Sequence, residues 1–291
     1  MNRRHFFKMA AVGLGGLSLS SVTQNVSAKE NGKPWPFKIG CAGYTFAKYN
    51  LDDSLKMMDR VNVRYMSLKD FHLPINASDE KIAEVLGKFK DRKITPYGVG
   101  PIYMKSEAEV NNAFAYAKKV GVKLIIGVPD YELLPLVEKK VKEYDFKVAI
   151  HIHGPDIKVF PVASDVWEHV KDLDERLGIC LDIGHTVRSG LDLIEDVKKY
   201  SSRIYDMHVW DVNKADKSGW CVEAGRGLID FAKLFNTLRE VNYTGVCSLE
   251  YAKDMNDVLP GVAESIPVQE RSTSGSGNRP SAHDRNGHAT P

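Results

Sequence analysis

The chain has 291 residues, of which 43% are hydrophobic and 27% charged, so it is long enough to bury a full core as one domain. Its formal net charge of +2 provides no general attraction to nucleic acid or to anionic membranes. Four cysteines are too few for a disulfide scaffold. These numbers favour one globular domain.

Residues 1–28 are typical of an export signal rather than of a folded segment. A pair of arginines precedes Phe-Phe-Lys and an apolar stretch at 9–19, and the small residues at 26–28 fit a cleavage site. The apolar stretch is shorter than the roughly 20 residues of a membrane span, so we expect no stable membrane insertion after signal removal. The paired arginines resemble a twin-arginine signal and predict an exported, periplasmic protein. An ordinary export signal or a retained anchor is the alternative.

Between residues 29 and 266, apolar strand-like runs alternate with amphipathic stretches. A strand, a helix and their loops take about 30 residues, which matches the spacing of the runs. The runs begin near Phe37, Val63, Ile94, Val122, Phe146, Leu177, Arg203 and Gly245. Helix starts are predicted at Ser78, Ser106, Ser164 and Asp192. This alternation predicts an α/β fold, the (β/α)8 TIM barrel, in preference to an open doubly wound sheet.

The C-terminal residues 267–291 have a different composition. They are rich in Ser, Gly, Pro and Arg and lack apolar periodicity, which predicts a disordered low-complexity tail. The last helix, expected from about Asn256 to Ile266, is therefore predicted to be incomplete.

Four of the predicted strands end in a side chain that can bind a metal, namely His151, Asp182, His208 and Glu250. Such groups cost several kcal/mol to bury unless they are paired or bound to a metal. The strand ends of a barrel converge on one face, so we predict a single divalent metal site suited to Mn, Zn, Co or Fe. His153 keeps the facing of His151 along the strand, and the sequence leaves open which of the two binds the ion.

Other polar residues near predicted strand ends are candidates for contacts with a substrate. His185 lies three residues past Asp182 and is expected to orient a metal ligand or to donate to a substrate hydroxyl. Lys69 could polarise a carbonyl or hold an anionic group, with a salt bridge to Asp70 as an equal alternative. The remaining candidates for substrate binding are His72, Arg188, Trp210 and Asp211.

Several of these elements together resemble the sugar phosphate isomerase/epimerase family of xylose-isomerase-like barrels. They are the run Asp182-Ile-Gly-His185-Thr186, the strand ending in His208, the terminal Ser248-Leu-Glu250 and the His-x-His pair. The resemblance covers residues 29–266. It implies a divalent metal, most often Mn, with Zn, Co, Fe and Mg as other candidates. It also implies a ketose or related substrate, with Asp182, His208 and Glu250 as ligands and His185 as a substrate contact.

One position departs from a pattern in this family. Many of its epimerases carry a glutamate on strand five, which pairs with the strand-eight glutamate as acid and base, whereas His151 stands here. Epimerisation needs proton transfer on both faces of one carbon. Glu250 remains as the carboxylate base, and His153, His185 and Lys69 are candidates for the second acid. Proton abstraction by one base, or abstraction followed by loss of a leaving group, fits this set better than a two-glutamate epimerase.

The sequence therefore predicts a metal-dependent carbohydrate isomerase or epimerase that removes a proton alpha to the carbonyl of a keto-sugar. The alternative is a lyase or dehydratase that acts on a keto-sugar or keto-glycoside through the same first step. A less expected alternative is an AP endonuclease-like nuclease, which would need more metal ligands and a basic groove for DNA. A further alternative is a sugar-binding barrel without catalytic activity. The expected partner is a small carbohydrate and not nucleic acid, and the sequence leaves a homo-oligomer open.

Overall fold

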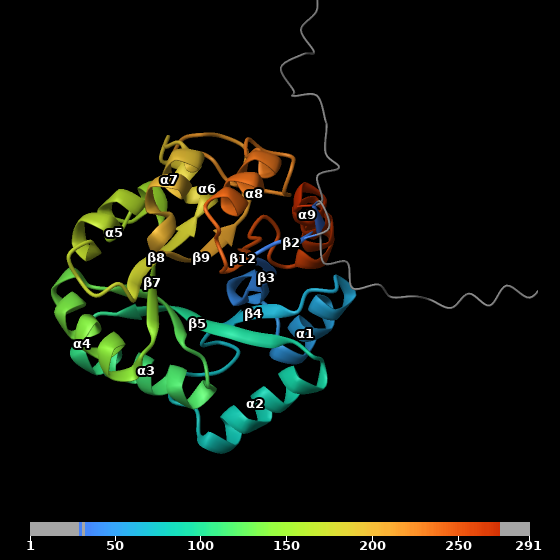
Figure 1. The fold of residues 1–291 in the computed structure, drawn as a ribbon. Coiled ribbons are helices and arrows are strands. Elements are labelled where there is room, and N and C mark those ends of the chain that lie inside the picture. Colours follow the sequence, from blue (N-terminus) through green and yellow to red (C-terminus); the bar gives the residue numbers. More distant parts are fainter. Residues whose placement is uncertain (1–28, 31–32, 274–291) are drawn as a thin grey trace, which may run out of the picture.

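The computed structural model of the protein describes residues 29–30 and 33–273, with a closed barrel of eight strands at its centre (Figure 1). All neighbouring strands of the barrel are parallel, and the last strand pairs with the first. In chain order these strands are β3 (Lys38–Ala42), β4 (Tyr65–Leu68), β5 (Thr95–Met104), β6 (Leu124–Pro129), β7 (Lys147–His151), β8 (Leu177–Asp182), β9 (Ile204–Val209) and β12 (Val246–Leu249). The predicted (β/α)8 barrel is thus confirmed.

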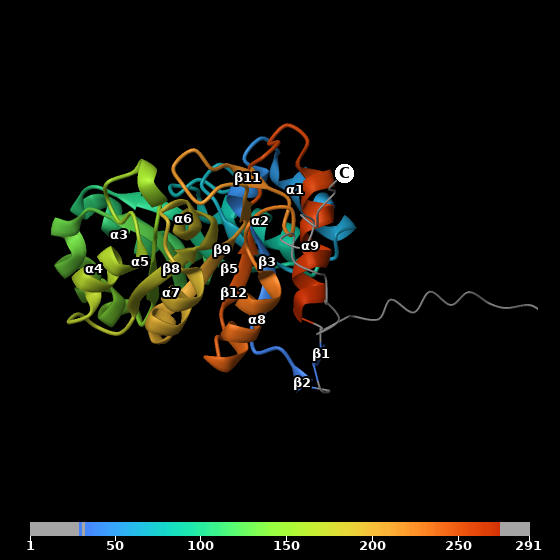
Figure 2. The same cartoon turned by 90° about the horizontal axis from the view of Figure 1, so that it is seen from above.

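Helices surround the barrel and follow the strands as expected. α3, α4 and α5 cover one side, while α1 and α9 lie on the opposite side (Figures 1 and 2). The helices are α1 (Leu51–Arg60), α2 (Asp79–Asp91), α3 (Glu107–Val120), α4 (Leu134–Tyr144), α5 (Ala163–Val170), α6 (Ile183–Arg188), α7 (Leu193–Tyr200), α8 (Phe231–Glu240) and α9 (Val258–Thr273).

Hydrogen-bonding side chains mark most of the predicted helix starts. Ser78, Ser106 and Asp192 each accept hydrogen bonds from backbone N–H groups in the first turn of their helices. The start of α5 is a correction, because this helix begins at Ala163, ahead of Ser164, and has no side-chain cap.

The apolar residues form two cores of unequal size. The large one lies between the strands and the helices, while a small cluster of Ile126, Ala149 and Cys180 lies on β6, β7 and β8. Ala149 and Cys180 precede His151 and Asp182 by two residues, so they share the strand face of these side chains. The small cluster therefore lies beneath the predicted metal ligands, inside the barrel.

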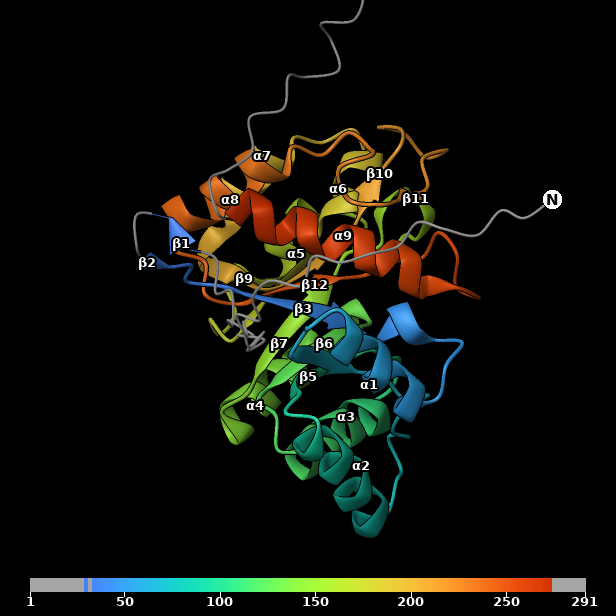
Figure 3. The ribbon, with the colours of Figure 1, turned by 90° about the vertical axis from the view of Figure 1, so that its right-hand side faces the viewer.

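The C-terminal helix corrects the predicted end of the folded region. α9 continues through Pro267 to Thr273 and contacts α8, β3 and β12, so the last helix is not cut short at Ile266 (Figure 3). Residues 274–291 of the predicted tail, and the predicted signal at residues 1–28, lie outside the described residues. Two short strands, β1 (Lys29–Glu30) and β2 (Lys33–Pro34), pair with each other ahead of the barrel. Within the described part of the chain, no helix has the length and apolar character needed to cross a membrane.

Candidate metal centre and active site

The four predicted metal ligands meet at one end of the barrel. His151, Asp182 and His208 lie on β7, β8 and β9, and Glu250 follows β12 directly. One ligand atom from each of the four side chains lies within 4.8 Å of the others. A tetrahedral ion with bonds of about 2.1 Å holds its ligand atoms roughly 3.4 Å apart, so small side-chain movements would complete such a site.

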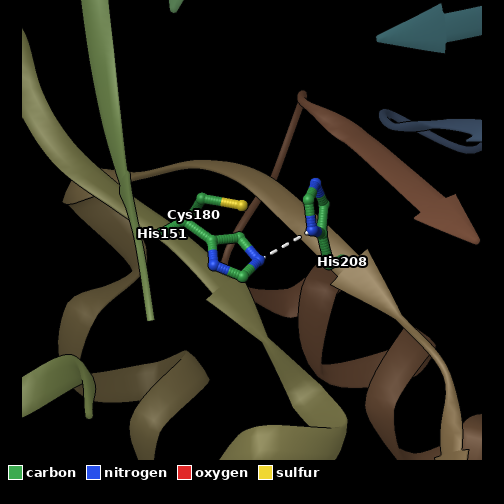
Figure 4. A group of neighbouring side chains, drawn as sticks. All are labelled: His151, Cys180 and His208. Carbon is green, nitrogen blue, oxygen red and sulfur yellow. Dashed lines mark hydrogen bonds between the residues drawn. The ribbon is translucent and has the colours of Figure 1, made fainter. Parts of the chain in front are cut away.

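The two imidazole rings of the group face each other (Figure 4). Nδ1 of His208 lies 2.9 Å from Nε2 of His151 and 2.6 Å from Oε2 of Glu250. Nε2 of His151 lies 3.8 Å from a carboxylate oxygen of Asp182 and 3.8 Å from one of Glu250. Two nitrogen donors and two carboxylates thus point at a common centre, a donor set suited to a divalent metal ion.

The Asp182 carboxylate provides the sharpest test of whether these residues fit a metal. Its Oδ1 accepts hydrogen bonds from the backbone N–H of His185 at 2.8 Å and from Nε1 of Trp210 at 2.7 Å. Its Oδ2 is buried and has no hydrogen-bond partner in the described structure. A buried carboxylate oxygen costs free energy when it has no partner, and a bound cation would remove that cost. The geometry of Asp182 therefore fits a metal ligand.

Burial and neighbouring charges set the protonation of the site. Burial opposes the charge of Glu250, but the adjacent His208 and His151 outweigh it and hold the pKa of Glu250 well below its ordinary value. Burial lowers the pKa of His151, and burial together with His151 lowers the pKa of His153 to about 3. Burial opposes the charge of His208, but Cys180 and Glu250 outweigh it and hold the pKa of His208 well above its ordinary value. These shifts favour an ionised Glu250 beside a charged His208, with neutral rings at His151 and His153.

His151, rather than His153, belongs to the group of four ligands. Nε2 of His153 is hydrogen-bonded to the hydroxyl of Tyr103 at 2.9 Å, and the two rings stack with centroids 5.6 Å apart. His153 also lines the cavity beside the ligands. It therefore lies between the four candidate ligands and the space for a substrate.

A cavity of about 450 Å³ opens directly over the ligands. Its size falls within the range of small-molecule sites. The lining residues come from most of the strand ends: Tyr44, Lys69, Pro101, Tyr103, His151, His153, His185, Arg188, Trp210, Gly219, Trp220, Cys221, Glu250 and Ala252. The predicted residues Lys69, His153, His185, Arg188 and Trp210 are thus brought together with two of the four ligands.

Lys69 both forms the salt bridge and lines the cavity, the two alternatives that the sequence left open for it. Its ammonium group pairs with Asp70 at 2.5 Å, and its side chain, 15% exposed, also lines the cavity. The pairing carboxylate is half exposed, so the interaction is screened by water and leaves the ammonium group available to a substrate oxygen.

Arg188 supports the wall of the cavity rather than facing it freely. It donates to Nδ1 of His185 at 3.1 Å and to the backbone oxygen of Lys217 at 2.9 Å, and it pairs with Asp156 at 2.7 Å. A guanidinium group can only donate, so Nδ1 of His185 accepts and the hydrogen of the neutral ring is on Nε2. Arg188 thus makes His185 a hydrogen-bond donor through Nε2.

Two residues predicted to bind substrate do not line the cavity. Nε2 of His72 lies 3.2 Å from the hydroxyl of Ser54 and 3.2 Å from the backbone oxygen of Tyr49, so its buried ring packs against the start of α1. The carboxylate of Asp211 accepts four backbone N–H bonds from residues 212, 225, 227 and 229. It fixes the loop that follows β10 (Asp211–Val212) and β11 (Cys221–Val222), which is a structural task.

Sequence reasoning missed two aromatic residues of the cavity wall, Tyr103 and Trp220. Trp220 is 58% exposed and precedes β11, a strand too short to be predicted from apolar periodicity. Tyr103 lies near the end of the ten-residue strand β5, where the alternation of facing offers a signal that could have found it.

The chain belongs to the xylose isomerase-like TIM barrel family, whose model matches residues 68–270. An inosose dehydratase of Clostridium perfringens is 30% identical over 129 residues, which is 39% of this chain and 43% of that protein. The chain aligns with less than half the length of the curated relatives it matches. The family resemblance predicted from the sequence is thus confirmed.

Solved structures share the fold at low sequence identity. A protein named IolI, solved with a bound zinc atom, has a TM-score of 0.65 at 20% identity, with 81% of this chain and 96% of that chain covered. A D-psicose 3-epimerase solved with D-fructose has a TM-score of 0.63 at 14% identity, with 82% and 98% covered. At these identities the similarity establishes the fold alone.

Proposed function

We propose that the protein is a metal-dependent carbohydrate enzyme that removes a proton alpha to the carbonyl of a keto-sugar or keto-glycoside. The observation that carries this proposal is the buried Oδ2 of Asp182, which has no hydrogen-bond partner among the described residues and lies within a cluster of two histidines and two carboxylates. A cavity of about 450 Å³ lies directly over that cluster. A divalent ion held by the four side chains would supply Lewis-acid stabilisation of the negative charge that develops on the carbonyl oxygen.

Glu250 is the proposed base. Its carboxylate is held ionised by the adjacent histidines, and its side chain, 13% exposed, reaches the cavity. It would take the proton from the carbon beside the carbonyl, and the released electron pair would form the carbon–carbon double bond of an enediolate. His185, through its Nε2–H, and Lys69, through its ammonium group, would donate hydrogen bonds to substrate oxygens.

The fate of the enediolate separates the two candidate reactions. Return of a proton to the neighbouring carbon gives an isomerase, and return of a proton to the opposite face of the same carbon gives an epimerase. Loss of a hydroxyl or glycosidic oxygen from the next carbon, with the proton taken by Glu250 passed on to the leaving oxygen, gives a dehydratase or lyase. A specific observation favours the second outcome, because the side chain at the strand-five position is His151, which is buried and neutral and offers no second carboxylate base.

Deuterium exchange tests the shared first step. Protein loaded with Mn²⁺ or Zn²⁺ is incubated in deuterated water with a panel of keto-sugars and 3-keto-glycosides, and the alpha proton is followed by NMR. We expect exchange or product formation that chelator-treated protein lacks. An epimerised or isomerised sugar indicates the first reaction, and release of water or of the aglycone indicates the second. No exchange with any substrate by metal-loaded protein would overturn the proposal.

An exported location remains part of the proposal and has its own test. Export would make phosphorylated sugars poor candidates, because they are scarce outside the cytoplasm. Fractionation of cells that express the full chain is expected to recover it outside the cytoplasm, and Arg3→Lys together with Arg4→Lys is expected to retain it inside.

A further inference from the structure

Asp206 is a fully buried carboxyl group to which the proposed reaction assigns no task. It lies on β9 two residues before His208, so both side chains share the inner face of the strand. Its Oδ1 has no hydrogen-bond partner in the described structure. Its Oδ2 accepts from the hydroxyl of Tyr97 at 3.3 Å and lies 3.7 Å from Sγ of Cys180. Burying a carboxyl group with so few partners costs several kcal/mol, so its presence calls for a compensating interaction.

The compensating interaction is with the metal-ligand histidine above it. Oδ2 of Asp206 lies 3.5 Å from Nε2 of His208, and this nitrogen is buried and has no hydrogen-bond partner within the described residues. The other nitrogen, Nδ1, faces Glu250 and His151. The His208 ring therefore lies between Asp206 inside the barrel and the ligand group at its mouth.

Elementary imidazole chemistry connects the two sides of this ring. A neutral imidazole carries one ring hydrogen, and the nitrogen that binds a cation must be the one without it. If Nδ1 serves the metal, the hydrogen of His208 is on Nε2 and points at Asp206. Carboxylates placed in this way behind a ligand histidine fix both the ring orientation and the tautomer.

We propose that Asp206 is a positioning residue that accepts the Nε2–H of His208 and so presents Nδ1 of this ring to the metal. Asp206 touches neither the metal nor the substrate, and it acts only through His208. The proposal rests on the proposed metal-dependent function, because it concerns the affinity of the same site.

The alternative is that Asp206 merely closes the inside of the barrel together with Tyr97 and Ser248. These two hydroxyl groups are hydrogen-bonded to each other at 2.5 Å, and Tyr97 alone of the two bonds to Asp206. They provide matched controls, since Tyr97→Phe and Ser248→Ala each remove an inner hydrogen bond and leave both Asp206 and His208 in place.

Zinc affinity of the full chain, measured by competition with a chelator, separates the two accounts. Asp206→Asn retains the shape of the side chain and is expected to weaken zinc binding about 10- to 100-fold. It should also shift the visible absorption of the Co²⁺-substituted protein. Tyr97→Phe and Ser248→Ala are expected to bind zinc within about threefold of the wild type. A wild-type-like affinity and Co²⁺ spectrum in Asp206→Asn, or equal losses in the two controls, would overturn the proposal.

A second measurement covers the case in which Asp206→Asn does not fold. In wild-type protein with ¹⁵N-labelled histidine and bound zinc, NMR is expected to place the ring hydrogen of His208 on Nε2, protected from exchange with water. A hydrogen on Nδ1 would contradict the positioning role. Failure of the wild type to bind zinc, Mn²⁺ or Co²⁺ would overturn the metal site itself, whereas tight binding by both wild type and variant would overturn only the role of Asp206.

Discussion

Strands β3 to β6 and strands β7, β8, β9 and β12 line the same cavity with different kinds of side chain. The first half contributes Tyr44, Lys69, Pro101 and Tyr103. Within the described part of the chain, the groups of side chains that could hold a metal come wholly from the second half. On the proposed function, the second half would perform proton transfer and the first half would hold part of the substrate. Substitutions in the second half should therefore act on turnover, and those in the first half on KM.

The largest effect is expected from Glu250→Gln in the second half. Loss of the base should reduce alpha-proton exchange about 1,000-fold, within the range that general base catalysis contributes. Substrate binding should persist, as measured by calorimetry. Glu223→Gln is the matched control, because Glu223 has a similarly buried side chain that pairs with Lys253 and lies outside the cavity lining. Exchange within tenfold of the wild type in Glu250→Gln would remove Glu250 from the mechanism.

His151→Glu adds a carboxylate where the family resemblance places one. If the second half lacks only a base on the opposite face of the carbon, this variant should form the epimerised sugar at least about tenfold faster than the wild type. His153→Glu places a carboxylate higher in the cavity and should not increase the rate at which the epimerised sugar forms. Product analysis by NMR compares the two, and an unchanged product pattern in His151→Glu would show that the position of a second base does not limit epimerisation.

Lys69→Met tests the first half of the barrel. Loss of a charged donor to a substrate oxygen should raise KM about tenfold and leave kcat within about threefold. Lys140→Met is closely matched, because Lys140 is 16% exposed and pairs with Glu143 much as Lys69 pairs with Asp70, but on α4 and away from the cavity. A fall in kcat without a change in KM would contradict the proposed division between the two halves.

Asp196→Asn should have the smallest effect and none on turnover, although Asp196 lies on α7 beside the ligand half. Burial raises the pKa of Asp196 from 3.8 to about 6, and its Oδ2 is buried without a partner in the described structure. The folded state thus binds the extra proton between these values, so stability falls as the pH rises from about 4 to 6 and stays lower above. At pH 7.5 the variant should raise Tm by about 2 °C, and the gain should disappear near pH 4. An unchanged Tm at both pH values would contradict the burial cost.

The barrel and the meeting of four candidate ligands at one end of it were predictable because both depend on features that the sequence records directly. Each barrel strand begins within two residues of its predicted position, since short apolar runs separated by amphipathic helices leave few alternatives. His151, Asp182, His208 and Glu250 were identified because ionisable groups at the ends of buried strands are costly without a partner.

The rest of the site depends on the orientation of side chains in turns and loops, which the amino-acid sequence does not show. His72 and Asp211 follow strand ends, but the turns after those ends direct their side chains to Ser54 and to the backbone of the next loop. The alternation of side chains along a strand could have corrected the prediction for Asp211. It places Asp206 and Trp210 on the same face as His208, and Asp211 on the opposite face. The end of α9 was misjudged because the residues from Pro267 onward have the composition of a disordered tail, whereas the helix continues through Pro267 to Thr273.

Arg188 has a consequence for the release of products. Its single guanidinium group joins α6, through His185, to the short helical turn at Gly154–Asp156 and to the backbone of Lys217 between β10 and β11. We therefore expect these three segments to move together on this side of the cavity. Relaxation experiments should find one shared exchange process for them instead of three, with a rate that Arg188→Lys would increase.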